Sequence, residues 1–483
     1  MKIKSYLTLI AAVALGLTAC DENQDVFEMG TLDGIEMVAR SASVEDGSTI
    51  MPVDSITVDF NNLVGIDASK AATLNGQAVQ AHVSPVNGMQ LVIPVALEFH
   101  KDYTLVIPDG MVYRRDDQKV TFKGLSVSFN TNYGLDVTNV ARSLTNANAT
   151  AEAVALYQEL LENYGKVMYS GAMGGVAFET AYTDFISANN GGAGYPKIVG
   201  FDYIHLYASQ PGGWVDYSDI TPVKSVWEAG SIPTVTWHWN VPENPENPDY
   251  TQISYRAANF SVVKALTPGT NENNIINADI EKLAGYMSLL QDAHIPVLFR
   301  PLHEAAGDYT WGPWFWWGND GVEATRQLWS YLRDKLEGEY GLNNLIWVWT
   351  MQTSDQGQPA SVETIRNAYP GDNLVDMVGT DLYPDDALTD QTAQFNLINT
   401  VVAGKKIICL SEVGNLIDPE AAAANNALWS YFMNWYDNEN YNQEGAPLVY
   451  GFGAWNTQAV TFGGTSYPNP WAAVANNRYV RNR

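Results

Sequence analysis

Apolar and polar residues alternate with a period of two between residues 31 and 132. The alternation is clearest at 56–60, 89–93, 103–108 and 125–131, and Asn-Gly or Asp-Gly pairs recur between these segments. Such alternation is typical of strands that bury one face, and the Gly pairs are typical of tight turns. We therefore predict a small all-β sandwich for residues 31–132.

The pattern changes after an Asn- and Thr-rich stretch at 133–148, which we interpret as a linker. Short apolar runs then alternate with segments of helical periodicity, beginning with a helix at 151–164 that Thr150 can cap. This alternation over residues 149–483 predicts an α/β fold of the (β/α)₈ TIM barrel type. The eight expected strands are 167–170, 198–204, 232–238, 296–303, 345–349, 374–383, 407–412 and 448–455, with further helices at 280–291, 324–337, 362–368 and 421–436.

Two of the expected strands end in a glutamate. The fourth runs into His303-Glu304, and the seventh ends at Glu412. Catalytic groups of such barrels lie at the carboxyl ends of the strands, so we expect the two carboxylates to face one cleft. Paired carboxylates are the groups that glycoside hydrolysis requires. A salt bridge or a metal ligand is the structural alternative for either residue.

Composition narrows the choice of ligand. The chain of 483 residues has 54 acidic and 26 basic residues and a net charge of -28, which opposes binding to nucleic acid or to anionic polymers. Its 15 Trp and 26 Tyr residues suit a cleft that stacks on sugar rings, although a large core would use them too. We expect a neutral polysaccharide partner and no cofactor, because no metal or cofactor motif is visible.

The N-terminus has the pattern of an export signal. Lys2 and Lys4 precede an apolar run at 6–17 that is too short for a comfortable membrane span. The sequence at 17–20 resembles the lipobox of bacterial lipoproteins, which implies removal of residues 1–19 and lipidation of Cys20; an ordinary signal-peptidase site is the alternative. Residues 20–30 form an acidic tether similar to that of surface lipoproteins. We expect an outer-membrane lipid anchor and exposure at the cell surface, with a periplasm-facing protein as the alternative.

One pair of motifs is similar to those of a known family. Arg300-Pro-Leu-His-Glu304 is followed by Trp314-Phe-Trp-Trp-Gly318, and together they resemble glycoside hydrolase family 26, a family of retaining (β/α)₈ enzymes. The resemblance implies that Glu304 is the acid/base and Glu412 the nucleophile. It also implies an endo-β-1,4-mannanase acting on mannan, glucomannan or galactomannan.

Further site residues follow from the same resemblance. His303 would hold the glutamate network, Tyr383 would donate to the nucleophile, and His238 would contact the sugar in the -1 subsite. Trp314 and Trp455 would stack on the sugar chain. For His238, Trp314 and Trp455, as for the family carboxylate matched by Asp381, a structural role is the alternative.

The sequence departs from the family pattern in two places. Residues 305–313 separate Glu304 from Trp314 by more than the usual spacing, and Asn456 stands where some relatives have Arg. The exact sugar therefore stays open: a xylanase, a mixed-linkage glucanase, a mannobiose-releasing enzyme and a non-catalytic glycan-binding lipoprotein are the alternatives. Residues 31–132 resemble a bacterial Ig-like domain, for which we expect a spacer role, and we expect the whole protein to be a monomer.

Overall fold

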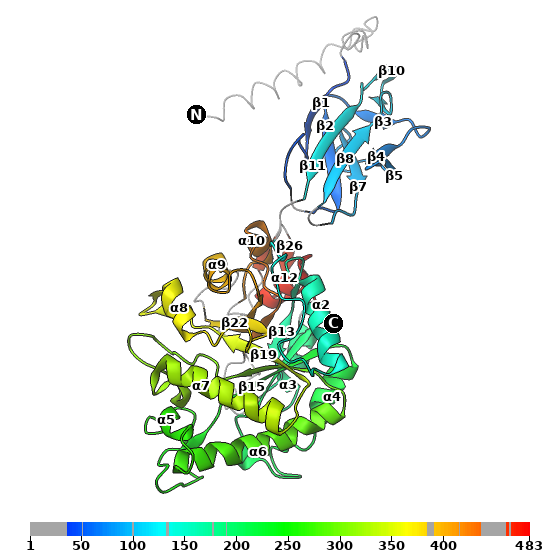
Figure 1. Cartoon of the computed structure of the whole chain (residues 1–483). Helices are drawn as coiled ribbons and strands as arrows, with labels where there is room; N and C mark the ends of the chain where they lie inside the picture. The colour runs from blue at the N-terminus through cyan, green and yellow to red at the C-terminus, as the bar shows by residue number, and fades with distance from the viewer. Residues whose placement is uncertain are drawn as a thin grey trace, which may run out of the picture. The chain divides into compact units, whose positions relative to one another are not determined.

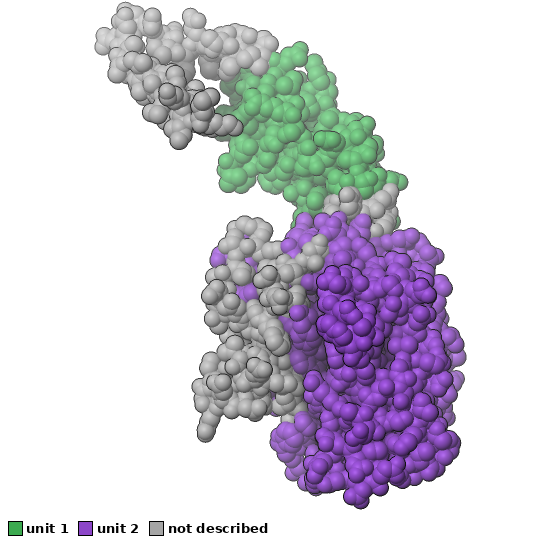
Figure 2. Space-filling view, turned by 90° about the vertical axis from the view of Figure 1, so that its left-hand side faces the viewer, with its two compact units in different colours: residues 1–132 green, residues 133–483 purple. Residues whose placement is uncertain are grey.

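A computed structural model of the chain describes residues 36–50, 52–98, 101–131, 135–175, 178–189, 191–383, 391–414, 416–435, 460–462 and 465–483. The chain divides into two compact units, residues 1–132 and residues 133–483 (Figure 2). The stretch at 133–148 thus belongs to the second unit. Its Thr145 hydroxyl donates to Asp376 at 2.7 Å, and Ala141 N donates to Lys405 O.

The first unit is built from antiparallel strands around one apolar core. The strands that the alternation predicts are present as β2 (Ser55–Phe60), β7 (Gln90–Pro94), β8 (Asp102–Ile107) and β11 (Leu125–Asn130). In β2, Ile56, Val58 and Phe60 are buried while the residues between them are partly exposed, as a period of two requires. The remaining strands are β1 (Ala39–Ala42), β3 (Val64–Ile66), β4 (Ala72–Leu74), β5 (Gln77–Val79), β6 (His82–Val83), β9 (Val112–Arg114) and β10 (Asp117–Thr121).

The second unit is a closed barrel of eight parallel strands, which confirms the predicted TIM barrel (Figure 1). Most of these strands are buried on both faces, as strands covered by helices on the outside must be. Their order around the barrel is β13 (Gly171–Met173), β14 (Ile198–Asp202), β15 (Ile232–Trp237), β18 (Val297–Pro301), β19 (Leu345–Thr350), β22 (Met377–Leu382), β23 (Ile407–Val413) and β24 (Phe432–Asn434).

Helices surround these strands (Figure 1). Thr150 caps the first of them by accepting a hydrogen bond from Ala153 N, as expected for this position. Residues 239–275, which follow β15, include the short antiparallel strands β16 (Val241–Pro242) and β17 (Ile253–Ser254), and a long helix begins at Asn271. Among the described residues of this unit, the α-helices are α2 (Ala151–Asn163), α3 (Ala181–Asn189), α4 (Thr221–Glu228), α5 (Val262–Ala265), α6 (Asn271–Asp292), α7 (Gly321–Arg333), α8 (Val362–Ala368), α9 (Thr392–Val401), α10 (Pro419–Ala424) and α12 (Pro470–Ala475).

The predicted end of the barrel is wrong. We expected a helix at 421–436 and the eighth strand at 448–455, but α10 ends at Ala424 and β24 closes the barrel between β23 and β13. The alanine-rich start of the segment favours a helix, whereas its apolar end pairs with the exposed edges of two neighbouring strands. Residues 448–455 lie outside the described residues.

Within the described part of the chain, we find no helix long and apolar enough to cross a membrane.

Candidate active site

The structure brings Glu304 and Glu412 together at the carboxyl end of the barrel. Glu412 is the sixth residue of β23, and Glu304 follows three residues after the end of β18. One carboxylate oxygen of each, together with one of Asp381, lie within 4.8 Å of one another. Oxygens this close agree with the carboxyl separation of retaining glycosidases, about 5–5.5 Å, better than with that of inverting enzymes, about 6.5–9.5 Å.

The turn that presents Glu304 has an unusual backbone. Leu302 and Glu304 both have positive φ values, 52° and 47°, which residues other than glycine rarely adopt. Gly307 N donates to Glu304 O at 2.9 Å, and the Trp317 indole donates to His303 O at 3.0 Å, so the turn is held from both sides. Such strain concentrates at functional sites, where the surrounding structure imposes it.

Arg300 organises the floor of the site. It is fully buried in β18, and its guanidinium donates to Glu412 Oε1 and, at 3.1 Å, to Asp381 Oδ2. The other oxygen of Glu412 accepts the Tyr383 hydroxyl at 2.6 Å, while Ser411 donates to Asp381 at 2.7 Å. Glu412 thus has a donor on each oxygen, which fixes its orientation and stabilises its charge.

Burial and neighbouring negative charges raise the pKa of two of the three carboxyl groups, Glu304 and Asp381. Burial raises the pKa of Glu304 well above its ordinary value, and the negative charges of Asp381 and Glu412 raise it further. Burial, followed by Glu412, also raises the pKa of Asp381 to about 7, against the opposing effect of Arg300. A carboxyl group that keeps its proton at neutral pH, next to one held by an arginine, is what an acid and a nucleophile need.

His238 and His303 lie side by side in this site. His238 follows β15, and its Nδ1 is 2.6 Å from Asp202 Oδ2, at the end of β14. The Nε2 atoms of the two histidines are 3.1 Å apart, and His303 Nδ1 is 3.2 Å from the Thr236 hydroxyl. Both predicted histidines therefore belong to the site, but they contact each other as well as the cleft.

Glu304, Glu412 and both histidines line a cleft of about 320 Å³. Trp314, another of the predicted residues, lies at its edge with 44% of its surface exposed, and Tyr383 is 42% exposed. An exposed ring beside a polar floor is suited to stacking on a sugar. By contrast, Trp316 and Trp317 are fully buried, as expected for core residues. Trp455 and Asn456, as well as Cys20, lie outside the described residues.

Sequence reasoning missed several residues of the site, some in the cleft and one, Arg300, buried beneath the carboxylates. Trp435 follows β24 and lines the cleft, with its ring centroid 5.7 Å from that of His238. We had placed it inside a helix, so its position at a strand end could not be predicted. Arg300 stands in the motif that identified the site, and a buried charge in a strand was a signal that we did not use. The other lining residues that were missed are Asp202, Ile204, Tyr255, Arg256 and Phe315.

The carboxylates of Glu304, Asp381 and Glu412 are close enough to hold a cation in geometric terms. Arg300, however, already donates to two of them and supplies the positive charge that a metal would bring. The arrangement is therefore that of an acid–base site rather than of a metal centre.

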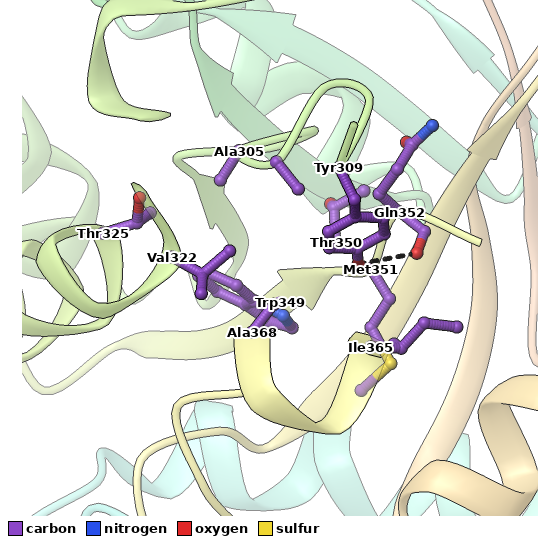
Figure 3. A pocket seen from close by; sticks show the side chains of 11 residues that line it. Ala305, Tyr309, Val322, Thr325, Trp349, Thr350, Met351, Gln352, Ile365 and Ala368 are labelled. Carbon is purple, nitrogen blue, oxygen red and sulfur yellow. Dashed lines mark hydrogen bonds between the residues drawn. The ribbon is translucent and has the colours of Figure 1, made fainter. Parts of the chain in front are cut away.

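A second, apolar pocket lies behind the loop that follows Glu304 (Figure 3). Ala305 and Tyr309 line it from the loop, and residues of α7, β19 and α8 close it; the Tyr309 hydroxyl donates to Gln352 O at 2.9 Å. Its volume of about 10 Å³ holds about one water molecule, for which the buried Thr350 hydroxyl offers a partner. This pocket supports the loop and is too small for a sugar.

The family model for glycosyl hydrolase family 26 matches residues 145–452. This chain belongs to that family. The match spans the whole barrel and all of the site residues described above. Family 26 membership agrees with the proximity of the carboxylates and with the positions of Glu304 just after the fourth barrel strand and of Glu412 in the seventh.

Characterised relatives have similar sequences. The chain is 32% identical over 310 residues to a mannan endo-1,4-β-mannosidase of Thermothelomyces thermophilus, covering 63% of this chain and 59% of the relative. It is 29% identical over 344 residues to an enzyme of the same name from Bacillus subtilis, covering 68% and 86%. Matches to three of these relatives, from Thermothelomyces and Piromyces, span only about half of the relatives' own length.

Solved family 26 structures are also similar. The family 26 domain of an endo-β-mannanase/endo-β-glucanase from Prevotella bryantii is 32% identical with a TM-score of 0.59, covering 70% of this chain and 98% of that domain. A β-mannanase from a symbiotic protist of the termite Reticulitermes speratus, solved with a gluco-manno-oligosaccharide, is 31% identical with a TM-score of 0.56, covering 71% and 97%.

Proposed function

We propose that this protein is an endo-β-1,4-mannanase that cleaves mannan, glucomannan or galactomannan with retention of configuration. The observation that carries the proposal is the proximity of the Glu304 and Glu412 carboxylates, within 4.8 Å, in a cleft edged by an exposed tryptophan. The choice of mannan is supported by relatives that are named mannan endo-1,4-β-mannosidases and by a relative solved with a gluco-manno-oligosaccharide.

In the first step, a Glu412 oxygen attacks the anomeric carbon and forms a glycosyl ester as the glycosidic bond breaks. Glu304 gives its proton to the departing glycosidic oxygen, so the leaving sugar departs as an alcohol. The raised pKa of Glu304 keeps this proton available, and the hydrogen bonds from Arg300 and Tyr383 hold Glu412 in place for attack.

In the second step, Glu304 takes a proton from water, and the resulting hydroxide oxygen attacks the anomeric carbon. The ester bond breaks and Glu412 leaves as a carboxylate, which restores the resting state. Esterification removes the negative charge of Glu412, one of the charges that raise the pKa of Glu304. The pKa of Glu304 therefore falls when Glu412 is esterified, so Glu304 holds its proton for the first step and is ionised, and able to accept a proton, in the second.

The test is a product profile of the full chain on linear mannan, xylan and mixed-linkage glucan, run beside Glu304→Gln and Glu412→Gln. We expect a ladder of manno-oligosaccharides from mannan and a loss of at least about a hundredfold in each variant. Release of mannobiose alone would point to an exo-type enzyme. Faster hydrolysis of xylan or glucan than of mannan would show that mannan is not the preferred substrate. Near-full activity in either variant would contradict the assignment of the pair.

We further propose that Cys20 is lipidated after removal of residues 1–19, that the protein is anchored to the outer membrane, and that it faces the cell exterior as a monomer. The lipobox-like sequence at 17–20 and the acidic residues after it support this proposal. The first unit, which resembles an Ig-like domain, would then act as a spacer.

The anchor is tested by growing cells with a labelled fatty acid and comparing wild type with Cys20→Ser. Label should enter the wild-type protein and not the variant. Digestion of the protein by a protease added to intact cells would support surface exposure, and protection would favour a periplasm-facing protein.

A further inference from the structure

A chain of hydrogen bonds lies beside the two glutamates, and its contacts indicate which atom donates at each step. It runs from Asp202 through His238 and His303 to Thr236. The four contacts are Asp202 Oδ2 to His238 Nδ1 at 2.6 Å, His238 Nε2 to His303 Nε2 at 3.1 Å, His303 Nδ1 to the Thr236 hydroxyl at 3.2 Å, and that hydroxyl to Arg300 O at 3.2 Å. All five groups are buried or nearly so, so each contact must carry one proton to be favourable.

The far end of the chain fixes the proton on His303. The Thr236 hydroxyl has a single hydrogen, and it is used when it donates to Arg300 O. Thr236 must then accept from His303, so the proton of His303 is on Nδ1. A neutral His303 has no proton on Nε2, and this nitrogen can only accept.

The near end then fixes the charge of His238. Because His303 Nε2 accepts, His238 Nε2 must donate. His238 Nδ1 must also donate, since it faces a carboxylate oxygen at 2.6 Å. A histidine that donates from both ring nitrogens is an imidazolium.

The neutral alternative satisfies the chain less well. If His303 donated to a neutral His238, His303 Nδ1 would need the only proton of Thr236, and the contact from that hydroxyl to Arg300 O would lose its hydrogen. The direction of the pKa values agrees with the charged form. Burial opposes the charge on His238, yet Asp202 raises the pKa of His238 above its ordinary value, while burial and the neighbouring His238 lower that of His303.

We propose that Asp202 holds His238 as a permanent imidazolium beside the carboxylate pair, which makes Asp202 a positioning residue of the active site. The inference rests on the proposed glycosidase site, but it does not depend on which sugar is bound. With Arg300, His238 supplies a second positive charge next to three carboxyl groups. Its Nε2 proton also fixes the ring of His303, the residue directly before Glu304.

The groups that face His238 come from several elements. Asp202 from β14 and Glu412 from β23 favour its charge, whereas Arg300 from β18 opposes it. The rings of Tyr255 and His303 pack against it, with centroids 5.2 and 4.4 Å away. Of these groups, Asp202 is the negatively charged acceptor in contact with a ring nitrogen of His238. Removal of its charge should therefore lower the pKa of His238 more than any other single change.

Nitrogen NMR of the labelled full chain tests the charge directly, and the six histidines of the sequence allow assignment by single substitutions. At pH 7.5, about one unit above the ordinary histidine value, both ring nitrogens of His238 should be protonated and only Nδ1 of His303. A His238 with one protonated nitrogen at this pH would overturn the proposal. This measurement needs no substrate, so a failure of the proposed mannanase activity would be recognised separately.

Asp202→Asn provides the functional test. The midpoint of His238 protonation should fall by at least about one pH unit, and kcat should gain a pH dependence near that midpoint that wild type lacks.

The matched control is Asp279→Asn, which also changes a buried acid to an amide. Asp279 accepts a hydrogen bond at 2.7 Å from the indole of Trp239, the residue after His238. His238 should keep both protons in this control. An unchanged midpoint in Asp202→Asn, or an equal fall in both variants, would contradict the role of Asp202; if Asp202→Asn fails to fold, the wild-type spectrum alone still decides.

Discussion

At the scale of single residues, the site is a set of carboxyl groups that the protein treats differently. Glu412 is gripped by Arg300 and Tyr383, whereas burial and two negative neighbours keep the proton on Glu304. The difference in environment, and not in residue type, assigns the nucleophile and the acid.

Asp381→Asn should move the alkaline limb of kcat/KM to lower pH. Asp381 is one of the negative charges that raise the pKa of Glu304, so its neutralisation lets Glu304 lose its proton earlier as pH rises. Because the enzyme needs protonated Glu304 for the first step, kcat/KM falls as Glu304 loses its proton. A pH profile of kcat/KM for both proteins measures the shift, and an alkaline limb at the same or a higher pH in the variant would contradict this cause.

Tyr383→Phe should lower kcat by about tenfold to a hundredfold, the effect of losing a hydrogen bond to a charged group. The hydroxyl donates to Glu412 at 2.6 Å, and the partly exposed ring can stay in place, so the fold should be unaffected. The control is Tyr309→Phe, which also loses one hydroxyl contact, to Gln352 O in the neighbouring loop. Steady-state kinetics of both variants decide; equal kcat values would show that the Tyr383 hydroxyl has no special role.

The residues that sequence could and could not predict differ in a physical way. Glu304 and Glu412 were predictable because a charge at the end of an apolar strand has few structural reasons to be there. Trp435 was not, because the apolar run before it fits a helix as well as a three-residue strand, and pairing with β13 and β23 decides between them. The contact between His238 and His303 joins two strands, and nothing in the local sequence of either one indicates it.

At the scale of elements, the loop at 305–313 is where the sequence led us to expect a departure from the family spacing. It is a pinned structure: Asp308 accepts hydrogen bonds from Trp311 N at 2.7 Å and from Gln356 N at 2.6 Å, and Asp308 and Gly312 bond to each other through their backbones. These hydrogen bonds hold the loop between Glu304 and Trp314 in one conformation.

Asp308→Ala should destabilise the protein by about 1–3 kcal/mol, since it leaves backbone donors without their acceptor. Asp308→Asn is the matched control, because its carbonyl oxygen can still accept and the loss should be smaller. Chemical denaturation of both variants measures the difference. If Asp308→Ala unfolds at the same denaturant concentration as wild type, the loop is not held by this side chain.

At the scale of the whole molecule, the stability of the fold and the function of the site oppose each other. A buried Glu304 with a raised pKa binds its proton more tightly in the folded than in the unfolded state. Below the ordinary carboxyl value both states are protonated. As pH rises above it, only the unfolded state gains by releasing the proton, so the folded protein loses stability until the raised pKa is reached.

Glu304→Gln should therefore melt at a higher temperature than wild type at pH 8, because the amide avoids this cost, and the difference should shrink toward pH 4. Glu363→Gln, at an exposed position in the first turn of α8, is the control and should not raise the melting temperature. Thermal unfolding at the two pH values measures both. A stabilisation that is as large at pH 4 as at pH 8 would show that ionisation of Glu304 is not its source.

The account depends most directly on a double displacement at Glu412. Proton NMR during the first minutes of hydrolysis of a linear β-1,4-manno-oligosaccharide measures which anomer forms first. Retention predicts that the β-anomer appears first and that the α-anomer follows by mutarotation. Initial formation of the α-anomer would mean that water attacks directly, and it would contradict the proposed roles of Glu304 and Glu412.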